Sequence, residues 1–378
     1  MSLKIGELRK QPEGYEAFVP GEFPPKDGWK FSDKLNQKHS NAIWQIGKLD
    51  GRTRLLPDVE FFLSMYMRKD AAKSSQIEGT QATMIDAIEA EAKTSDALPK
   101  DVDDILHYIK ALNYGLNRLK EFPLSLRFIR ELHGELMRGA RATQFPNPGE
   151  FRRSQNRIGG TSMMDAHFVP PPPAELPRAL ADLERFLHEK DQLLPLYKAG
   201  LIHAQFETIH PFLDGNGRTG RLLITMYLWF RGLLEKPVLF LSSFFKKHQA
   251  EYYDRLNAYH NGEIELWLDF FLEGVMDTSL QAVSVADAIT VICQGDMEKV
   301  QSLGKPSAAS GVIVLRQLFA LPIVNVAVIQ RWTGYSQPGA QRVIDRLLEL
   351  NILEQKSKGK KYARSYIYRR YVDAFNID

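Results

Sequence analysis

Residues 210–221 read His-Pro-Phe-Leu-Asp-Gly-Asn-Gly-Arg-Thr-Gly-Arg, and this stretch is the most unusual in the chain. It places a glycine-rich turn directly before the apolar segment 222–230, which we predict to be a helix. Backbone N–H groups and the N-terminus of that helix would then face one spot, an arrangement that binds phosphate. Its Gly-x-Gly-x-x-Gly pattern also occurs in dinucleotide-binding turns. Those turns follow a buried strand, whereas residues 201–209 have the pattern of a polar-faced helix.

Four side chains of this stretch have complementary chemistry. Arg218 and Arg221 are three residues apart, so both can lean toward the same spot and clasp phosphate oxygens. Asp214 supplies a hard oxygen ligand, which suits Mg²⁺ held jointly with substrate phosphates. His210 can accept a proton near neutral pH. A base, a metal ligand and two arginines beside a phosphate cradle predict a site of phosphoryl or nucleotidyl transfer.

A zinc-hydrolase site is the weaker interpretation of the same region. His203, Glu207 and His210 are close in the sequence. They do not have the His-Glu-x-x-His spacing that places two histidines and a glutamate on one face of a zinc-binding helix. We therefore favour the phosphate-binding interpretation.

The composition is that of an ordinary globular protein, with 44% hydrophobic and 25% charged residues in a chain of 378. The net charge of +3 means that any nucleic-acid surface must come from local clustering. The single cysteine, Cys293, excludes an internal disulfide and gives no reason to place the protein outside a reducing compartment. The N-terminus has no apolar signal region, and segment 222–230 is far shorter than the roughly 20 residues of a membrane span. We expect a cytoplasmic protein with no membrane partner.

Helical periodicity dominates from about residue 40 to about residue 300, so we predict a mainly α fold. The length suggests about two domains. Residues 1–60 are expected to form an N-terminal arm, extended at least over the proline-punctuated first 40 residues. Residues 61–300 are expected to form the helical catalytic domain. A Gly/Pro/Ser/Ala-rich linker at 302–311 should lead into a C-terminal domain at 308–378.

The C-terminal domain shows three short helical patterns, at 312–319, at 326–333 and from residue 336 onward. A β-type segment at 352–353, a turn at 358–360 and an alternating segment at 366–368 follow. Three helices followed by a hairpin have the layout of a winged helix-turn-helix.

Basic residues cluster in this hairpin, at Lys356, Lys358, Lys360, Lys361, Arg364, Arg369 and Arg370. The preceding helix is expected to expose Gln337, Gln341, Arg342 and Arg346. Such a surface would suit DNA. A solvated basic face and a protein-contact or dimerisation module fit the same pattern, and a homodimer is compatible with the sequence.

Residues 210–221 resemble the signature of the Fic family, His-x-Phe-x-Asp/Glu-Gly-Asn-Gly-Arg-x-x-Arg, at every fixed position. Residues 149–160 and the proline run 170–173 are similar to the family's flap region. The resemblance implies a helical domain with a short β-hairpin flap. Because members mostly transfer AMP from ATP to a hydroxyl of a target protein, it also implies an adenylyltransferase. ATP would be the substrate, Mg²⁺ the cofactor, a Ser, Thr or Tyr side chain the acceptor and pyrophosphate the product, and the enzyme would also modify itself.

The resemblance further implies a role for individual residues. His210 would be the catalytic base and Asp214 the Mg²⁺ ligand. Flap residues would be Ile158, Gly159 and Gly160, with residues 161–166 lengthening the loop. ATP binding is implied for Asp214, Gly215, Asn216, Gly217, Arg218, Thr219, Gly220 and Arg221, and for Tyr253 and Asn257 near the adenine.

Residues 74–79 resemble the family's inhibitory motif, Ser/Thr-x-x-x-Glu-Gly/Asn, through Ser74, Glu78 and Gly79. In the family this glutamate pairs with the second arginine of the signature, here Arg221. An Arg–carboxylate pair competes directly with an Arg–phosphate pair, so the resemblance implies an autoinhibited enzyme. Taken alone, the same spacing also fits a solvated helix face.

Two other functions stay open at this point. The chain could be a winged-helix DNA-binding regulator whose Fic core senses nucleotide, or an enzyme that removes AMP. The presence of both His210 and Asp214 favours an enzyme, because a sensor needs no base.

Overall fold

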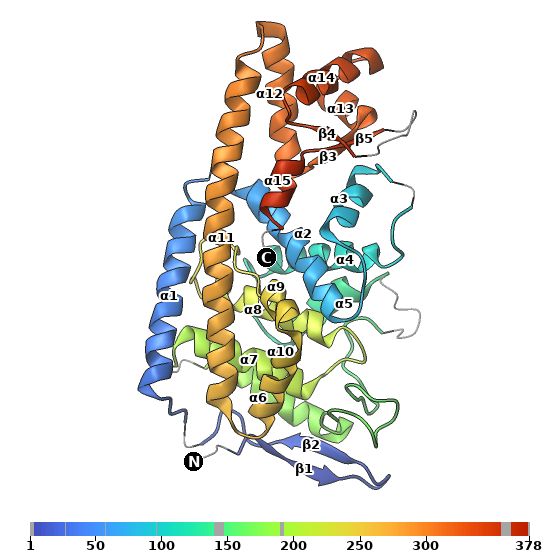
Figure 1. Ribbon diagram of the computed structural model, residues 1–378. Coiled ribbons are helices and arrows are strands. Elements are labelled where there is room, and N and C mark those ends of the chain that lie inside the picture. The colour runs from blue at the N-terminus through green and yellow to red at the C-terminus, as the bar shows by residue number, and fades with distance from the viewer. Residues whose placement is uncertain are drawn as a thin grey trace.

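The computed structural model describes residues 4–26, 28–56, 58–95, 97–139, 147–189, 193–356 and 364–376. The prediction of a mainly α fold is confirmed (Figure 1). In chain order the elements are β1 (Gly6–Lys10), β2 (Glu16–Pro20), α1 (Asp33–Thr53), α2 (Val59–Ile77), α3 (Met84–Ala92), α4 (Val102–Arg118), α5 (Leu126–Met137), the 3₁₀ turn η2 (Pro173–Glu175), α6 (Leu176–His188), α7 (Pro195–Ile209), α8 (Asn216–Phe230), α9 (Ser242–Lys247), α10 (Gln249–His260), α11 (Ile264–Gln301), α12 (Lys305–Ala320), β3 (Ile323–Asn325), α13 (Val326–Thr333), α14 (Gln337–Glu349), β4 (Glu354–Gln355), β5 (Ser365–Ile367) and α15 (Arg369–Ala374).

The 38-residue helix α11 is the longest element in the described part of the chain, and α1 lies along one side of it (Figure 1). Ion pairs join the two helices, from Lys38 to Asp269 at 2.7 Å and from Arg52 to Asp287. Among the described residues, α11 is long and apolar enough to cross a membrane by length and composition alone. Segment 222–230, considered above, is not. The core helix of a globular protein passes the same test. Packing of α11 against α1, α10 and α12 accounts for its buried apolar residues.

The N-terminal segment is not the extended arm that we expected. β1 and β2 pair as an antiparallel hairpin in which Gly6 lies opposite Pro20, and α1 follows as a 21-residue helix. Phe18 of the hairpin is buried, as are Leu35 and Ile46 on one face of α1. The prolines suggested an extended arm, but Pro20 ends β2 and Pro24 and Pro25 lie between the hairpin and α1, so they interrupt neither element.

The prediction of a linker at 302–311 is also wrong. Residues 302–304 alone separate α11 from α12, because α12 already begins at Lys305. Pro306 lies in the first turn of α12, where a helix tolerates a residue without an N–H group. Pro and Gly near a helix N-terminus therefore looked like a linker in the sequence.

The C-terminal residues are arranged in the order α12, β3, α13, α14, β4 and β5, with a sheet order of β3-β5-β4. α13 has the predicted bounds, and α14 begins directly after Ser336. The short buried strand β3 was not predicted. The expected turn at 358–360 and the basic residues Lys358, Lys360 and Lys361 lie outside the described residues. The domain limits and the winged-helix assignment remain predictions.

This C-terminal part packs on α2 and α3 (Figure 1). Phe375 is fully buried, and its ring lies 5.5 Å from that of Tyr66 and 6.0 Å from that of Phe62, both in α2. Lys356 forms an ion pair with Glu89 of α3 at 2.5 Å. The C-terminal part therefore rests on the helix that leads to Glu78.

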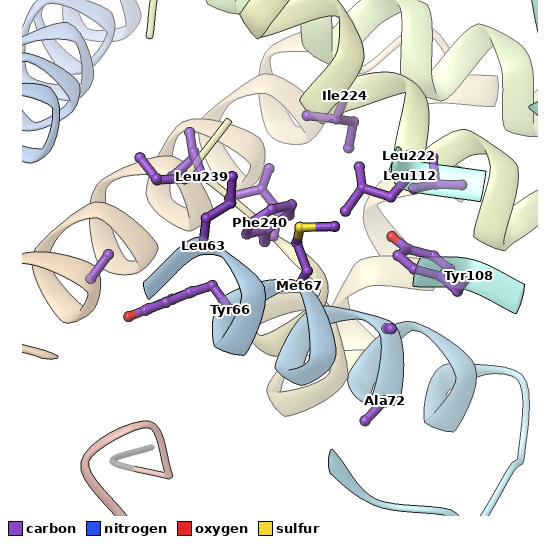
Figure 2. Packing of buried hydrophobic residues seen from close by; sticks show 14 of the residues in the cluster. Leu63, Tyr66, Met67, Ala72, Tyr108, Leu112, Leu222, Ile224, Leu239 and Phe240 are labelled. Carbon is purple, nitrogen blue, oxygen red and sulfur yellow. The ribbon is translucent and has the colours of Figure 1, made fainter. Parts of the chain in front are cut away.

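The core positions α2 against the signature helix α8. Met67 of α2, Tyr108 of α4, Ile224 of α8 and Phe240 from the segment before α9 are all buried and lie around one another (Figure 2). Because burying such side chains contributes about 1.5–3 kcal/mol each, this cluster holds the end of α2 close to the start of α8.

Candidate functional site

The signature loop joins α7 to α8, as the sequence predicted. α7 ends at Ile209, and His210 adopts the left-handed conformation with φ of 48°. α8 begins at Asn216, directly after Gly215, which has φ of 75°. A side chain at Gly215 would also collide with Met137, since a Cβ there would lie 2.6 Å from the sulfur. The left-handed backbone at His210 costs of order 1–3 kcal/mol, which the surrounding contacts must offset.

Two predicted ATP-binding residues hold the loop itself. The Asn216 side chain accepts a hydrogen bond from the Phe212 N–H and donates one to the Phe212 carbonyl, both at 2.8 Å. The Thr219 hydroxyl donates to the carbonyl of Gly215 at 2.8 Å. These bonds hold the loop against the first turn of α8. The side chains of Asn216 and Thr219 therefore fix the shape of the predicted phosphate site.

His133 of α5 holds the signature loop through its imidazole, and the sequence did not predict this role. Its Nδ1 accepts a hydrogen bond from the Gly149 N–H at 2.8 Å, which leaves Nε2–H to donate to the carbonyl of Asp214 at 3.0 Å. The imidazole stacks on Phe212 with ring centroids 3.7 Å apart. Burial lowers the pKa of His133 to about 4, so the ring is neutral at pH 7.

Arg152 ties the flap region to the loop. Its guanidinium donates to the backbone carbonyl of His210 at 2.9 Å and to that of Pro171 at 2.6 Å. Burial lowers its pKa to about 10, and the side chain stays charged at pH 7. Residue 152 belongs to the stretch that resembles the flap, but its spacing gave no sign that it holds the signature loop. His133 and Arg152 acquire their roles through tertiary contacts.

His210 is mostly buried, with 16% of its side chain exposed. Burial lowers the pKa of His210 to about 4, against an opposite effect of the Glu78 carboxylate. The imidazole is therefore neutral at pH 7, which is the state that a general base needs.

The two signature arginines differ in their contacts. The side chain of Arg218 is 7% exposed, and its Nε and Nη1 have no hydrogen-bond partner, although Asp104 lies 3.7 Å away. Arg221 donates from Nε to the Ser74 hydroxyl at 2.9 Å, and from Nη2 to the Ser74 carbonyl at 3.0 Å. Its Nη2 also pairs with Glu78 at 2.6 Å. Arg218 thus keeps nitrogens without a hydrogen-bond partner, whereas Arg221 is already engaged.

The motif at residues 74–79 thus meets Arg221 across 143 positions of sequence. Glu78 follows the last residue of α2, and Gly79 turns the chain with φ of 92°. Burial would raise the pKa of Glu78, but Arg221 outweighs that effect and lowers it. The carboxylate lies against the first turn of α8, because a Cβ at Gly217 would collide with Glu78 Oε1. The pairing implied by the resemblance is present.

The Asp214 carboxylate is a suitable ligand for a divalent cation that is also bound by substrate phosphates. Its side chain is 48% exposed, Oδ1 accepts the Gly215 N–H at 2.6 Å, and Oδ2 lies 3.9 Å from Arg218. No group of three or more His, Cys, Asp or Glu side chains among the described residues could hold a metal ion. Mg²⁺ accepts a site of this kind, since it is usually bound by one or two carboxylates with water and substrate phosphates.

Tyr253 and Asn257, the two residues expected near the adenine, have different surroundings. Tyr253 of α10 is 40% exposed. One turn earlier Gln249 donates to the carbonyl of Ile77 at 3.1 Å, so α10 lies against the end of α2. Asn257, in contrast, lines a hollow of about 520 Å³ with Phe168 and residues of β1.

The flap is a single bridge between Ile158 and Phe168, with Gly159 and Gly160 at φ of 69° and 67°. The extra residues after Gly160 are ordered by Asp165, whose carboxylate accepts from the Thr161 and Ser162 backbones. The short hairpin that the resemblance implied is therefore present in reduced form.

Residues 123–228 match the Fic/DOC family. Residues 36–117 match the model of the Fic/DOC family N-terminal region. A protein adenylyltransferase Fic of Aedes aegypti is 33% identical over 181 residues, which are 47% of this chain and 33% of that protein. Its counterpart in Drosophila melanogaster is 26% identical over 283 residues, 72% of this chain and 53% of that protein. The match thus spans a third to about half the length of these curated relatives.

Solved structures agree on the fold. A Fic family protein from Desulfovibrio desulfuricans superposes with a TM-score of 0.56 at 20% identity, over 90% of this chain and 97% of that one. A Fic domain containing signaling protein from Bacteroides thetaiotaomicron gives 0.54 at 21% identity, over 65% and 97%. The Fic fold therefore carries the signature loop and the flap of this chain.

Proposed function

We propose that this chain is an autoinhibited protein adenylyltransferase. It transfers AMP from ATP to a Ser, Thr or Tyr hydroxyl of a target protein, releases pyrophosphate and also modifies itself. The contacts of Arg221 carry the proposal, since one phosphate-binding arginine is blocked by Glu78 while Arg218 beside it has unpaired N–H groups. The names of the Fic relatives support the choice of AMP as the transferred group.

The reaction is an in-line displacement at the α-phosphorus of ATP. A bond forms between the target oxygen and this phosphorus, and the bond to the oxygen bridging the α- and β-phosphates breaks. His210 takes the proton of the target hydroxyl, and the electron pair of the broken bond leaves with pyrophosphate. Positioning and charge neutralisation supply most of the acceleration in such reactions.

Three features of the chain would stabilise the charge that develops. The first turn of α8 presents backbone N–H groups at its N-terminus, with Gly217 leaving space above them. Arg218 and a released Arg221 would clasp the β- and γ-phosphates. Asp214 would hold Mg²⁺, which neutralises phosphate charge when bound.

In this proposal, inhibition arises because the Glu78 carboxylate and the γ-phosphate of ATP compete for Arg221 and for the same space beside Gly217. With Glu78 on Arg221, the γ-phosphate loses a partner and meets a carboxylate of like charge. ATP would then settle with its α-phosphorus out of line with the target hydroxyl. Releasing Glu78 restores both the arginine and the space.

Labelling with ATP that carries ³²P at the α-phosphate tests the activity. We expect label on the purified protein in the Glu78→Gly variant, weaker label on the parent and none in Glu78→Gly with His210→Ala. Label from γ-³²P ATP in place of α-³²P ATP would contradict AMP transfer. Release of AMP from pre-labelled protein, faster than its attachment, would favour an AMP-removing enzyme.

For the C-terminal part we propose a winged helix that contacts protein. The order of α12, β3, α13, α14, β4 and β5 supports the fold. Two of the basic residues that suggested DNA are engaged inside the chain, Lys356 with Glu89 and Arg370 with Asp296. Fluorescence anisotropy with a labelled 20-base-pair duplex distinguishes the partners. Binding that weakens steeply between 50 and 200 mM salt would favour the DNA-binding regulator instead.

A further inference from the structure

Glu207 is a buried carboxylic acid that the proposed reaction does not yet use. It lies on α7 one turn before His210, and the residue is 8% exposed. Its side chain occupies space that Gly220 of α8 leaves open, since a Cβ at Gly220 would collide with Glu207 Oε1. This oxygen has no hydrogen-bond partner, which is costly for a buried polar atom.

The neighbouring nitrogen of His210 is unpaired as well. His210 Nδ1 lies 3.9 Å from Glu207 Oε2 and has no hydrogen-bond partner. Glu207 Oε1 and His210 Nδ1 are thus both buried without a partner. The other carboxylate oxygen, Oε2, lies about 1 Å beyond hydrogen-bond distance of His210 Nδ1. Catalytic hydrogen bonds are often this long without substrate and shorten in the working complex.

We propose that Glu207 is the positioning residue of the catalytic base. This inference rests on the proposed function, because it concerns the same proton transfer. In the working complex the ionised Glu207 carboxylate accepts a hydrogen bond from His210 Nδ1–H. The lone pair of the imidazole then lies on Nε2, which takes the proton of the target hydroxyl. The resulting imidazolium is compensated by the carboxylate beside it, and Glu207 itself gains no proton.

The protonated acid would have the opposite effect. The O–H of a neutral Glu207 donates a hydrogen bond to His210 Nδ1, which places the ring hydrogen on Nε2 and removes the lone pair that the reaction needs. Burial raises the pKa of Glu207 to about 8. The base is therefore correctly oriented in a minority of molecules at pH 7 and in most of them at pH 9.

The charged and titratable neighbours of Glu207 come from three helices. Arg221 of α8 lowers the pKa of Glu207, whereas Glu78 of α2 raises it. Tyr252 of α10 is neutral, because burial raises its pKa well above the usual value, and its hydroxyl contacts His203 Nε2 at 2.8 Å. Burial lowers the pKa of His203 to about 3, so that ring is neutral too.

Two further charged side chains act on His210, those of Arg152 and Asp214. Arg152 lowers the pKa of His210 and Asp214 raises it, both by less than burial does. Near α10, Tyr253 also has a raised pKa, through burial first, and stays neutral below pH 9. The other groups with shifted pKa values around Glu207 and His210 keep their charge between pH 6 and 9, so we assign the acid limb in that range to Glu207.

The test compares Glu78→Gly with Glu78→Gly/Glu207→Gln, since glutamine matches glutamate in size. Initial rates of self-labelling from α-³²P ATP are measured between pH 6 and pH 9.5. For Glu78→Gly we expect a rise of about tenfold per pH unit below a break that lies under pH 8, because the removed Glu78 carboxylate raises the pKa of Glu207. For the Glu207→Gln variant we expect a flat profile and a rate at pH 9 lower by about 10²-fold. The exposed Glu251→Gln change in the same background serves as the matched control and should leave the break in place.

A second measurement does not depend on AMP transfer. ¹⁵N NMR of the imidazole nitrogens reports which one carries the hydrogen. In Glu78→Gly the His210 hydrogen should move from Nε2 to Nδ1 as the pH rises through the break in the rate profile, and in the Glu207→Gln variant it should not move. The backbone carbonyl of Glu207 also acts on His210. An unchanged break and an unchanged tautomer shift in the glutamine variant would assign the role to that carbonyl and overturn the proposal. Absence of label at every pH with the tautomer shift present would overturn the AMP-transfer function instead.

Discussion

Replacing Glu78 by glycine should accelerate AMP transfer, and the structure sets the size of the effect. Arg221 Nη2 and Glu78 Oε1 are 2.6 Å apart, a charge-assisted hydrogen bond of a kind worth about 1.5–3 kcal/mol. The arginine side chain is 2% exposed but the glutamate side chain is 39% exposed, so solvent screening favours the lower end of this range. At 1.4 kcal/mol per tenfold, loss of the pair should raise the population of competent ATP poses about tenfold.

The assay is the initial rate of self-labelling by purified protein with Mg²⁺ and α-³²P ATP. Glu78→Gln, which keeps the size and removes the charge, should give most of the gain. The gain should also require Arg221, so Glu78→Gly with Arg221→Ala should stay slow. Equal rates for the parent and Glu78→Gly would refute the inhibitory reading of residues 74–79. That result would leave the catalytic reading of residues 210–221 intact.

Three further changes test other parts of the molecule. His210→Ala in the Glu78→Gly background should lower AMP transfer by about 10²–10⁴-fold while ATP affinity stays similar, because the proposed role of His210 is at the target hydroxyl and not at the phosphates. Calorimetric titration showing lost ATP binding would contradict that role. Asp214→Ala should flatten the dependence of the rate on Mg²⁺ concentration, and a titration curve identical to that of the parent would exclude Asp214 as the metal ligand. Phe375→Ala empties a fully buried site against Phe62 and Tyr66 and should lower the free energy of unfolding by about 3–5 kcal/mol. A urea titration measures this loss, and a change below about 1 kcal/mol would mean that the C-terminal part does not rest on α2.

The signature loop was predictable because its chemistry is local. The glycines, the acid and the arginines follow one another in the order in which a turn and a helix N-terminus present them. The contact between Glu78 and Arg221 could not come from spacing, since α2 and α8 meet through a core built by several other helices. It was reached through the resemblance alone.

The supporting residues had no local signal. His133 and Arg152 hold backbone carbonyls of the loop, and any buried histidine or arginine elsewhere in the chain would look the same in the sequence. The N-terminal hairpin and the start of α12 were misjudged for a related reason. Proline and glycine mark both the ends of elements and true linkers, and tertiary packing decides between the two.

Gly217 places one limit on how this protein can vary. The space beside it is filled by the Glu78 carboxylate, and under the proposed function a bound phosphate takes this space during turnover. A side chain at that position would collide with the Glu78 carboxylate, so we expect it to disturb the pairing with Arg221 and the proposed phosphate site together. We therefore expect substitutions that release the proposed enzyme at the end of α2, around Glu78, and not at Gly217 in the first turn of α8.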